Sequence, residues 1–134
     1  MLFRSAIIHK RRDPAVPNEV TVHEIVGDVR GKTCLLVDDM IDTGGTIVKG
    51  AEALKKNGAT GVIVAATHAI FSPPAAERLS CDAIDRLIVT DTLPLRPDQR
   101  PEKLEVLSIA PLLARAIHEV FEDGSVTSMF NGAA

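Results

Sequence analysis

Residues 34–46 read C-L-L-V-D-D-M-I-D-T-G-G-T, and this order of residue types predicts a strand, a turn and a helix. The apolar run before Asp38 is typical of a buried parallel strand, and it ends in two adjacent carboxylates, Asp38 and Asp39. A third, Asp42, precedes a glycine-rich turn, and a helical pattern starts at Ile47. Free N–H groups, glycines that allow close approach and the helix dipole suit such a turn to an anion. Carboxylates beside it would accept hydrogen bonds from hydroxyls or bind a divalent cation, so the stretch predicts a site for a polyol phosphate.

The composition excludes several classes of function. The chain has 134 residues, with 46% hydrophobic and 25% charged, which predicts one ordinary globular domain. A net charge of -3 and 3% aromatic residues argue against a nucleic-acid partner. No apolar run approaches the ~20 residues that span a bilayer, so no membrane partner is expected. The first residues are too short for a signal peptide, which favours a cytoplasmic protein.

Strands and helices alternate along the rest of the sequence. Strands are expected at residues 5–9, 20–26, 33–37, 61–67, 85–90 and 104–107, and helices at 46–57, 72–79 and 109–122. Prolines at 14 and 17 place the basic cluster 10–12 on a loop. The last helix is expected to bury one apolar face, formed by Leu113, Ile117, Val120 and Phe121. The pattern predicts an α/β fold, a mostly parallel twisted sheet with helices on both faces.

Polar residues are expected just after several strand ends. These residues are Lys10, Asp38, Asp39, His68 and Asp91. Ligands of parallel sheets bind beyond the carboxyl ends of the strands, so the five could line one edge. His68 has a plainer interpretation, in which it satisfies a loop carbonyl.

Residues 37–46 resemble the phosphoribosyl-pyrophosphate loop of the type I phosphoribosyltransferase fold. That motif leaves two classes open, a phosphoribosyltransferase and a ribose-phosphate pyrophosphokinase. The surrounding stretches resemble the pyrophosphokinase family: A-I-I-H-K-R-R at 6–12, P-N-E-V at 17–20, V-G-D-V-R-G-K at 26–32, A-T-H-A-I-F-S at 66–72, V-T-D-T-L-P at 89–94 and G-S-V-T-S-M-F at 124–130. The resemblance covers about residues 5–130. It implies a phosphoribosyltransferase-like domain over residues 1–134, with a loose tail at 124–134.

Members of that family have two tandem domains, and this chain resembles only the second. We therefore expect a truncated chain that is inactive alone and exposes apolar surface suited to self-association. A non-catalytic module that binds ribose phosphate or associates with complete synthetase is the alternative. A phosphoribosyltransferase is a second alternative, disfavoured because little chain precedes the loop to form a base-binding hood.

The resemblance also implies a reaction and its residues. ATP and ribose 5-phosphate would give AMP and phosphoribosyl pyrophosphate, with Mg²⁺ as cofactor and ATP bound mostly by the domain that has no counterpart here. Lys10 would be the catalytic lysine and Arg12 its partner on the substrate phosphates; a solvated basic turn is the simpler reading of both. Asp38 and Asp39 would accept ribose hydroxyls or bind the metal.

The 5-phosphate would lie in the glycine-rich turn, on Asp42, Thr43, Gly44, Gly45 and Thr46. Asp42 could instead be only a helix N-cap. An allosteric phosphate site would use Ser125, Thr127 and Ser128, which could equally be a helix cap and a frayed tail. The full-length form is expected to be a homo-oligomer.

Overall fold

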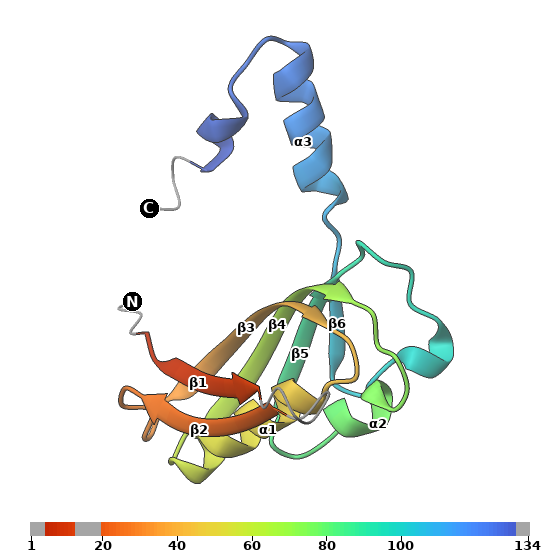
Figure 1. The fold of residues 1–134 in the computed structure, drawn as a ribbon. Helices are drawn as coiled ribbons and strands as arrows, with labels where there is room; N and C mark the ends of the chain where they lie inside the picture. Colours follow the sequence, from red (N-terminus) through yellow and green to blue (C-terminus); the bar gives the residue numbers. More distant parts are fainter. Residues whose placement is uncertain (1–4, 13–19, 131–134) are drawn as a thin grey trace.

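The chain forms a four-stranded parallel sheet with a separate two-stranded hairpin beside it (Figure 1). The computed structural model describes residues 5–12 and 20–130. The sheet order is β3 (Thr33–Ile41), β4 (Gly61–Ala69), β5 (Arg86–Thr90) and β6 (Leu104–Leu107). The predicted α/β class with a parallel sheet is confirmed, because each of these strands pairs in parallel with the next.

The core lies between this sheet and two helices, α1 (Gly45–Lys56) and α2 (Ala75–Leu79). Leu36, Val64 and Leu87 are in register on neighbouring strands and are all buried. Ile47, Ala51 and Leu54 supply the buried stripe of α1, at the spacing of one helix face. This one-sided packing holds the carboxyl end of β3 against the start of α1.

The second face of the sheet is open, contrary to the expectation of helices on both faces. Leu35 is 58% exposed and Val37 is 69% exposed, although both alternate along β3 with buried residues. The apolar run predicted a strand that is buried on both faces. Such a run indicates that both faces are apolar, but it does not say which segment covers the second face. In the described part of the chain, α1 and α2 both pack on the opposite face.

The hairpin consists of β1 (Ile7–Arg12) and β2 (Val20–Val26), which pair antiparallel. Lys10 and Arg12 therefore lie on a strand, and the prediction of a basic loop from residue 10 was wrong. The prolines at 14 and 17 restrict only their own neighbourhood, whereas β2 pairs with β1 up to Arg12, with a register shift between His9 and Lys10. Residues 13–19 lie outside the described residues.

The last helix, α3 (Ala110–Phe121), has the predicted bounds within one residue at each end but not the predicted burial. Ile117 is 69% exposed and Phe121 is 82% exposed; Leu113 and Val120 are exposed too. Figure 1 shows α3 beyond the carboxyl edge of the sheet, away from α1 and α2. Periodicity predicts which face of a helix is apolar but not what it packs against.

Two shorter features complete the description. A 3₁₀ helix, η2 (Val126–Phe130), lies near α3 within the segment expected to be a loose tail; residues 131–134 lie outside the described residues. Another, η1 (Pro97–Gln99), interrupts the loop before β6. Among the described residues, no helix is long and apolar enough to cross a membrane.

Candidate functional site

The glycine-rich turn lies where β3 leads into α1. Gly44 is the N-cap of α1 with φ +75°, and its carbonyl oxygen accepts a 3.0 Å hydrogen bond from the N–H of Val48. A Cβ at Gly44 would lie 3.0 Å from Cγ of Leu79, so both the backbone angle and the packing require glycine. Among the described residues no side chain caps the helix start. The N-cap role considered for Asp42 is therefore absent, and the first N–H groups of α1 face the turn.

Asp38 and Asp39 were predicted to follow the end of the strand, but both belong to β3. The strand continues to Ile41 because Met40 and Ile41 pair with His68 and Ala69 of β4. Asp38 is half-buried and Asp39 is exposed. Oδ1 of Asp38 accepts a 3.0 Å bond from the N–H of Asp39, and Oδ1 of Asp39 accepts a 2.8 Å bond from the N–H of Met40. These bonds turn both carboxylates toward the backbone near the carboxyl edge.

The carboxylate pair suits Mg²⁺ in one respect. Mg²⁺ prefers oxygen ligands and is usually held by one or two carboxylates together with substrate phosphates. Within the part of the chain that the structure describes, no group of three or more His, Cys, Asp or Glu side chains could hold a metal ion. The donor set therefore fits an ion shared with a phosphate ligand better than an ion bound by protein alone.

Arg78 of α2 adds a positive charge that the sequence reading missed. Its Nη1 donates to the carbonyl oxygen of Thr43 at 3.4 Å. The same nitrogen lies 3.6 Å from the position that a Cβ on Gly45 would occupy. Thirty-five residues separate Arg78 from Thr43, and only the packing of α2 against α1 brings the guanidinium to the turn. Its local sequence carries no sign of this role.

A hydroxyl network fixes the carboxyl end of β4. His68 was expected just after the strand, but it lies within β4. Its Nδ1 is 2.9 Å from Oγ1 of Thr92. The hydroxyls of Thr90 and Thr92 donate to the carbonyl oxygen of Thr67 at 2.6 and 3.0 Å. The imidazole thus bonds a hydroxyl, and the loop-carbonyl interpretation of His68 was wrong.

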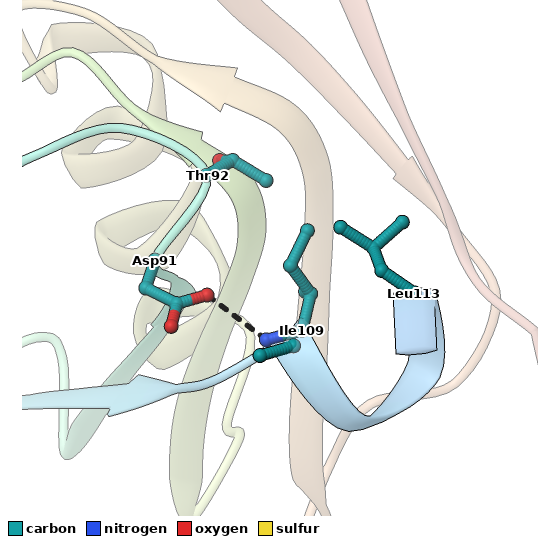
Figure 2. Close-up of a pocket in the computed structure, with 5 residues that line it drawn as sticks. Asp91, Thr92, Ile109 and Leu113 are labelled. Carbon is teal, nitrogen blue, oxygen red and sulfur yellow. Dashed lines mark hydrogen bonds between the residues drawn. The ribbon is translucent and has the colours of Figure 1, made fainter. Parts of the chain in front are cut away.

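Asp91 does follow the end of β5, but its contacts are structural (Figure 2). Its Oδ1 accepts a 2.9 Å bond from the N–H of Ile109, and its own N–H donates to the carbonyl oxygen of Leu107 at 3.2 Å. Hydrogen bonds from the Ser108 hydroxyl and then from the Ile109 N–H hold the pKa of Asp91 below its usual value. Asp91 therefore anchors the connection between β6 and α3. A pocket of about 340 Å³ lies there.

The remaining predicted residues lie on the hairpin and on η2. Lys10 and Arg12 are Cα partners of Val22 and Val20 in the hairpin, and their side chains lie outside the description. Ser125 and Thr127 belong to the η2 region, where both the N–H and the hydroxyl of Ser128 donate to the carbonyl oxygen of Ser125, at 3.0 and 2.6 Å. Figure 1 places η2 beside α3, away from α1. The structure therefore places Arg78 beside the glycine turn, while Asp38 and Asp39 lie upstream of the turn on β3.

Comparison with known proteins identifies the family. Residues 5–131 match the model of the phosphoribosyl synthetase-associated domain. A ribose-phosphate pyrophosphokinase from Streptomyces coelicolor is 59% identical over 94% of this chain and 39% of its own length. The one from Mycobacterium tuberculosis is 57% identical over 96% of this chain and 40% of its own length.

A solved structure gives the same answer. The phosphoribosylpyrophosphate synthetase from Mycobacterium smegmatis matches with a TM-score of 0.75 and 51% identity, over 89% of this chain and 37% of that one. The chain thus spans about two fifths of the length of these relatives. With 127 of its residues matched by the family model, the chain belongs to the phosphoribosyl synthetase-associated domain family.

Proposed function

We propose that this chain is the ribose-5-phosphate-binding part of a ribose-phosphate diphosphokinase. The reaction would transfer the β,γ-pyrophosphoryl group of ATP to the anomeric hydroxyl of ribose 5-phosphate and release AMP. The observation that carries the proposal is the start of α1, which is uncapped by side chains and reached through two glycines beside a carboxylate pair. Relatives named for this activity support it.

The turn would bind the 5-phosphate. The N–H groups that open α1 would donate to phosphate oxygens, with the hydroxyls of Thr43 and Thr46 as further donors. Gly45 leaves room for the ligand, because a Cβ there would meet its nearest described atom only at 3.6 Å. Asp42 would help to order the turn, and Arg78 would add charge beside it.

The acidic pair would bind the sugar. Asp38 and Asp39 accept hydrogen bonds only, which suits the ribose hydroxyls directly or through Mg²⁺. When bound, Mg²⁺ would neutralise charge on the phosphates during transfer. The carboxylates of this chain would orient the ribose so that its anomeric hydroxyl faces ATP.

Lys10 and Arg12 would supply the positive charge that phosphoryl transfer requires. The hairpin that carries them packs against α1 through β2, so its strands could approach the same edge. We further propose that ATP is bound mostly by sequence present in the relatives and not matched here. A regulatory phosphate site at Ser125, Thr127 and Ser128, a homo-oligomeric full-length form and a cytoplasmic location complete the proposal.

Binding of ribose 5-phosphate by calorimetry tests the turn. Asp42→Ala and Gly45→Val should each abolish binding while the circular dichroism spectrum stays unchanged. Asp28→Ala is the matched control, because Asp28 is an exposed aspartate in another turn, paired with Lys32 at 2.7 Å. Unchanged affinity in Asp42→Ala and Gly45→Val would refute the phosphate assignment.

Turnover tests the reaction. The chain is mixed with ATP, Mg²⁺ and ribose 5-phosphate, with and without a separately expressed N-terminal half of a relative, and AMP is measured. AMP formed only with the added half supports the proposal. AMP formed by this chain alone would contradict the need for that half. Pyrophosphate released from phosphoribosyl pyrophosphate and a nucleobase, with no AMP in either mixture, would identify a transferase instead.

A further inference from the structure

Two apolar surfaces of this chain have no cover in the described structure. The first, which we term the open sheet face, is the side of the four strands that α1 and α2 do not cover. Its apolar residues are Leu35, Val37 and Leu107, which are exposed, and Ile63, Ala65 and Ile88, which are half-buried. The second, the α3 stripe, consists of Leu113, Ile117, Val120 and Phe121, which recur at the spacing of one helix face. The two surfaces could cover each other, because apolar helix stripes and apolar sheet faces are commonly buried against one another.

The open sheet face has a shallow hollow. A hollow of about 230 Å³ runs across it, between Val37 of β3, Ile88 of β5 and Leu107 of β6. The face has the width of three strand spacings, roughly 14 Å. The twelve residues of α3 span about 18 Å. One helix of this length therefore crosses the whole face.

The helix does not reach the open sheet face of its own chain. Only Ser108 and Ile109 separate β6 from α3, and Asp91 holds this connection through the Ile109 N–H (Figure 2). Figure 1 shows α3 beyond the carboxyl edge of the sheet. To cover its own sheet, α3 would have to reverse its direction within the two-residue connection. A second molecule can meet the stripe without this change.

We propose that two copies of this chain exchange their α3 helices, each placing its α3 stripe on the open sheet face of the other. The area favours this arrangement over a one-way contact. A large apolar side chain buries roughly 60–120 Å² at about 25 cal/mol per Å². Allowing for the partial exposure seen here, one docking buries about 500 Å², below the ~1,000 Å² of a specific interface. Two reciprocal dockings reach about 1,000 Å².

Charge also favours a second copy over a lipid surface. Helices that bind anionic membranes are rich in Lys and Arg on their polar face. The polar face of α3 carries Arg115 and His118 against Glu119 and Glu122, which gives no excess of positive charge. On the open sheet face itself, Arg86 and Glu105 are the register partners of Ile63 and Ile88, and they form a salt bridge with each other. These two charges balance each other, and Val37, Ala65 and Ile88 beside them offer an apolar contact.

Sedimentation velocity and native mass spectrometry on the full chain test the exchange. The wild type should be a dimer whose fraction falls on dilution. Leu35→Glu on the sheet and Ile117→Glu on the helix should each raise the dimer dissociation constant by at least about 100-fold, because each buries an unpaired charge. Arg115→Ala, on the polar face of α3, is the control and should change it by less than about threefold. Circular dichroism checks that each variant folds.

Mixing the two defective variants separates exchange from its rivals. Leu35→Glu retains an intact helix and Ile117→Glu an intact sheet, so their mixture should form a heterodimer with one complete docking. Two monomeric variants that stay monomeric when mixed would overturn the proposal. A wild type that is still monomeric at about 200 µM would overturn it too, because a dissociation constant of about 1 µM would give mostly dimer at that concentration. A monomeric wild type would indicate that α3 packs on the open sheet face of its own chain. Association of the wild type that neither substitution weakens would overturn it as well, in favour of another surface.

Discussion

Replacing Gly44 by alanine tests the physical reasoning behind the glycine turn. Gly44 has φ +75°, a region that costs an L-residue about 1–2 kcal/mol. Its new Cβ would also lie 3.0 Å from Cγ of Leu79, which is fully buried and has little room to move. Inserting a methyl group into a packed site costs about 1–3 kcal/mol. Gly44→Ala should therefore lower the free energy of unfolding by about 2–5 kcal/mol.

Gly31→Ala is the matched control for this prediction. Gly31 has a similar φ of +70°, but a Cβ there meets no atom within 4 Å. It should lose only the backbone contribution, about 1–2 kcal/mol. Urea unfolding followed by circular dichroism measures both variants, and a loss of about 2–5 kcal/mol moves the midpoint by roughly 1–2.5 M.

A double-mutant cycle with Leu79→Ala isolates the packing contribution. Truncating Leu79 removes the atoms that the new Cβ would meet, so the two substitutions together should cost less than the sum of the two alone. The coupling free energy should be about 1 kcal/mol or more. The reasoning is refuted if Gly44→Ala costs no more than Gly31→Ala, or if the cycle shows coupling below about 0.5 kcal/mol.

Three further predictions concern single side chains. Asp85→Asn should destabilise the fold by about 1 kcal/mol in urea unfolding, because Asp85 accepts the N–H of Val62 at 2.6 Å and pairs with Lys55 at 3.0 Å; an unchanged midpoint would contradict this. The pKa of Asp91 is lowered in the folded protein, so its anchoring of α3 should persist at neutral pH and be lost in acid, as the pH falls through that lowered pKa. The sign would be a loss in acid of the protection of the Ile109 amide against hydrogen exchange, measured relative to the unfolded chain, and this pH dependence should be absent in Asp91→Asn. Arg78→Ala should weaken ribose 5-phosphate binding about fivefold at low salt, and less at high salt. An equal loss of affinity in the control variant Arg96→Ala would show that only the overall positive charge of the protein matters.

Much of the candidate site could be read from local sequence. The order of apolar residues, carboxylates and glycines between residues 34 and 46 predicted the strand, the turn and the start of α1, because each depends on neighbours within a few residues. Gly44 is the clearest case, since only glycine adopts its backbone angle without cost. The same stretches carried the resemblance that the family match confirms.

Other features depend on residues that are distant in sequence. Arg78 joins the turn only through the packing of α2 on α1, and β3 extends past Asp39 only because β4 pairs with it as far as Ala69. The 69% exposure of Ile117 is the sharpest example. Periodicity showed that α3 has an apolar stripe, but the surface that a stripe meets depends on long-range geometry. Here Asp91, 18 residues before Ile109 in the sequence, holds the connection between β6 and α3.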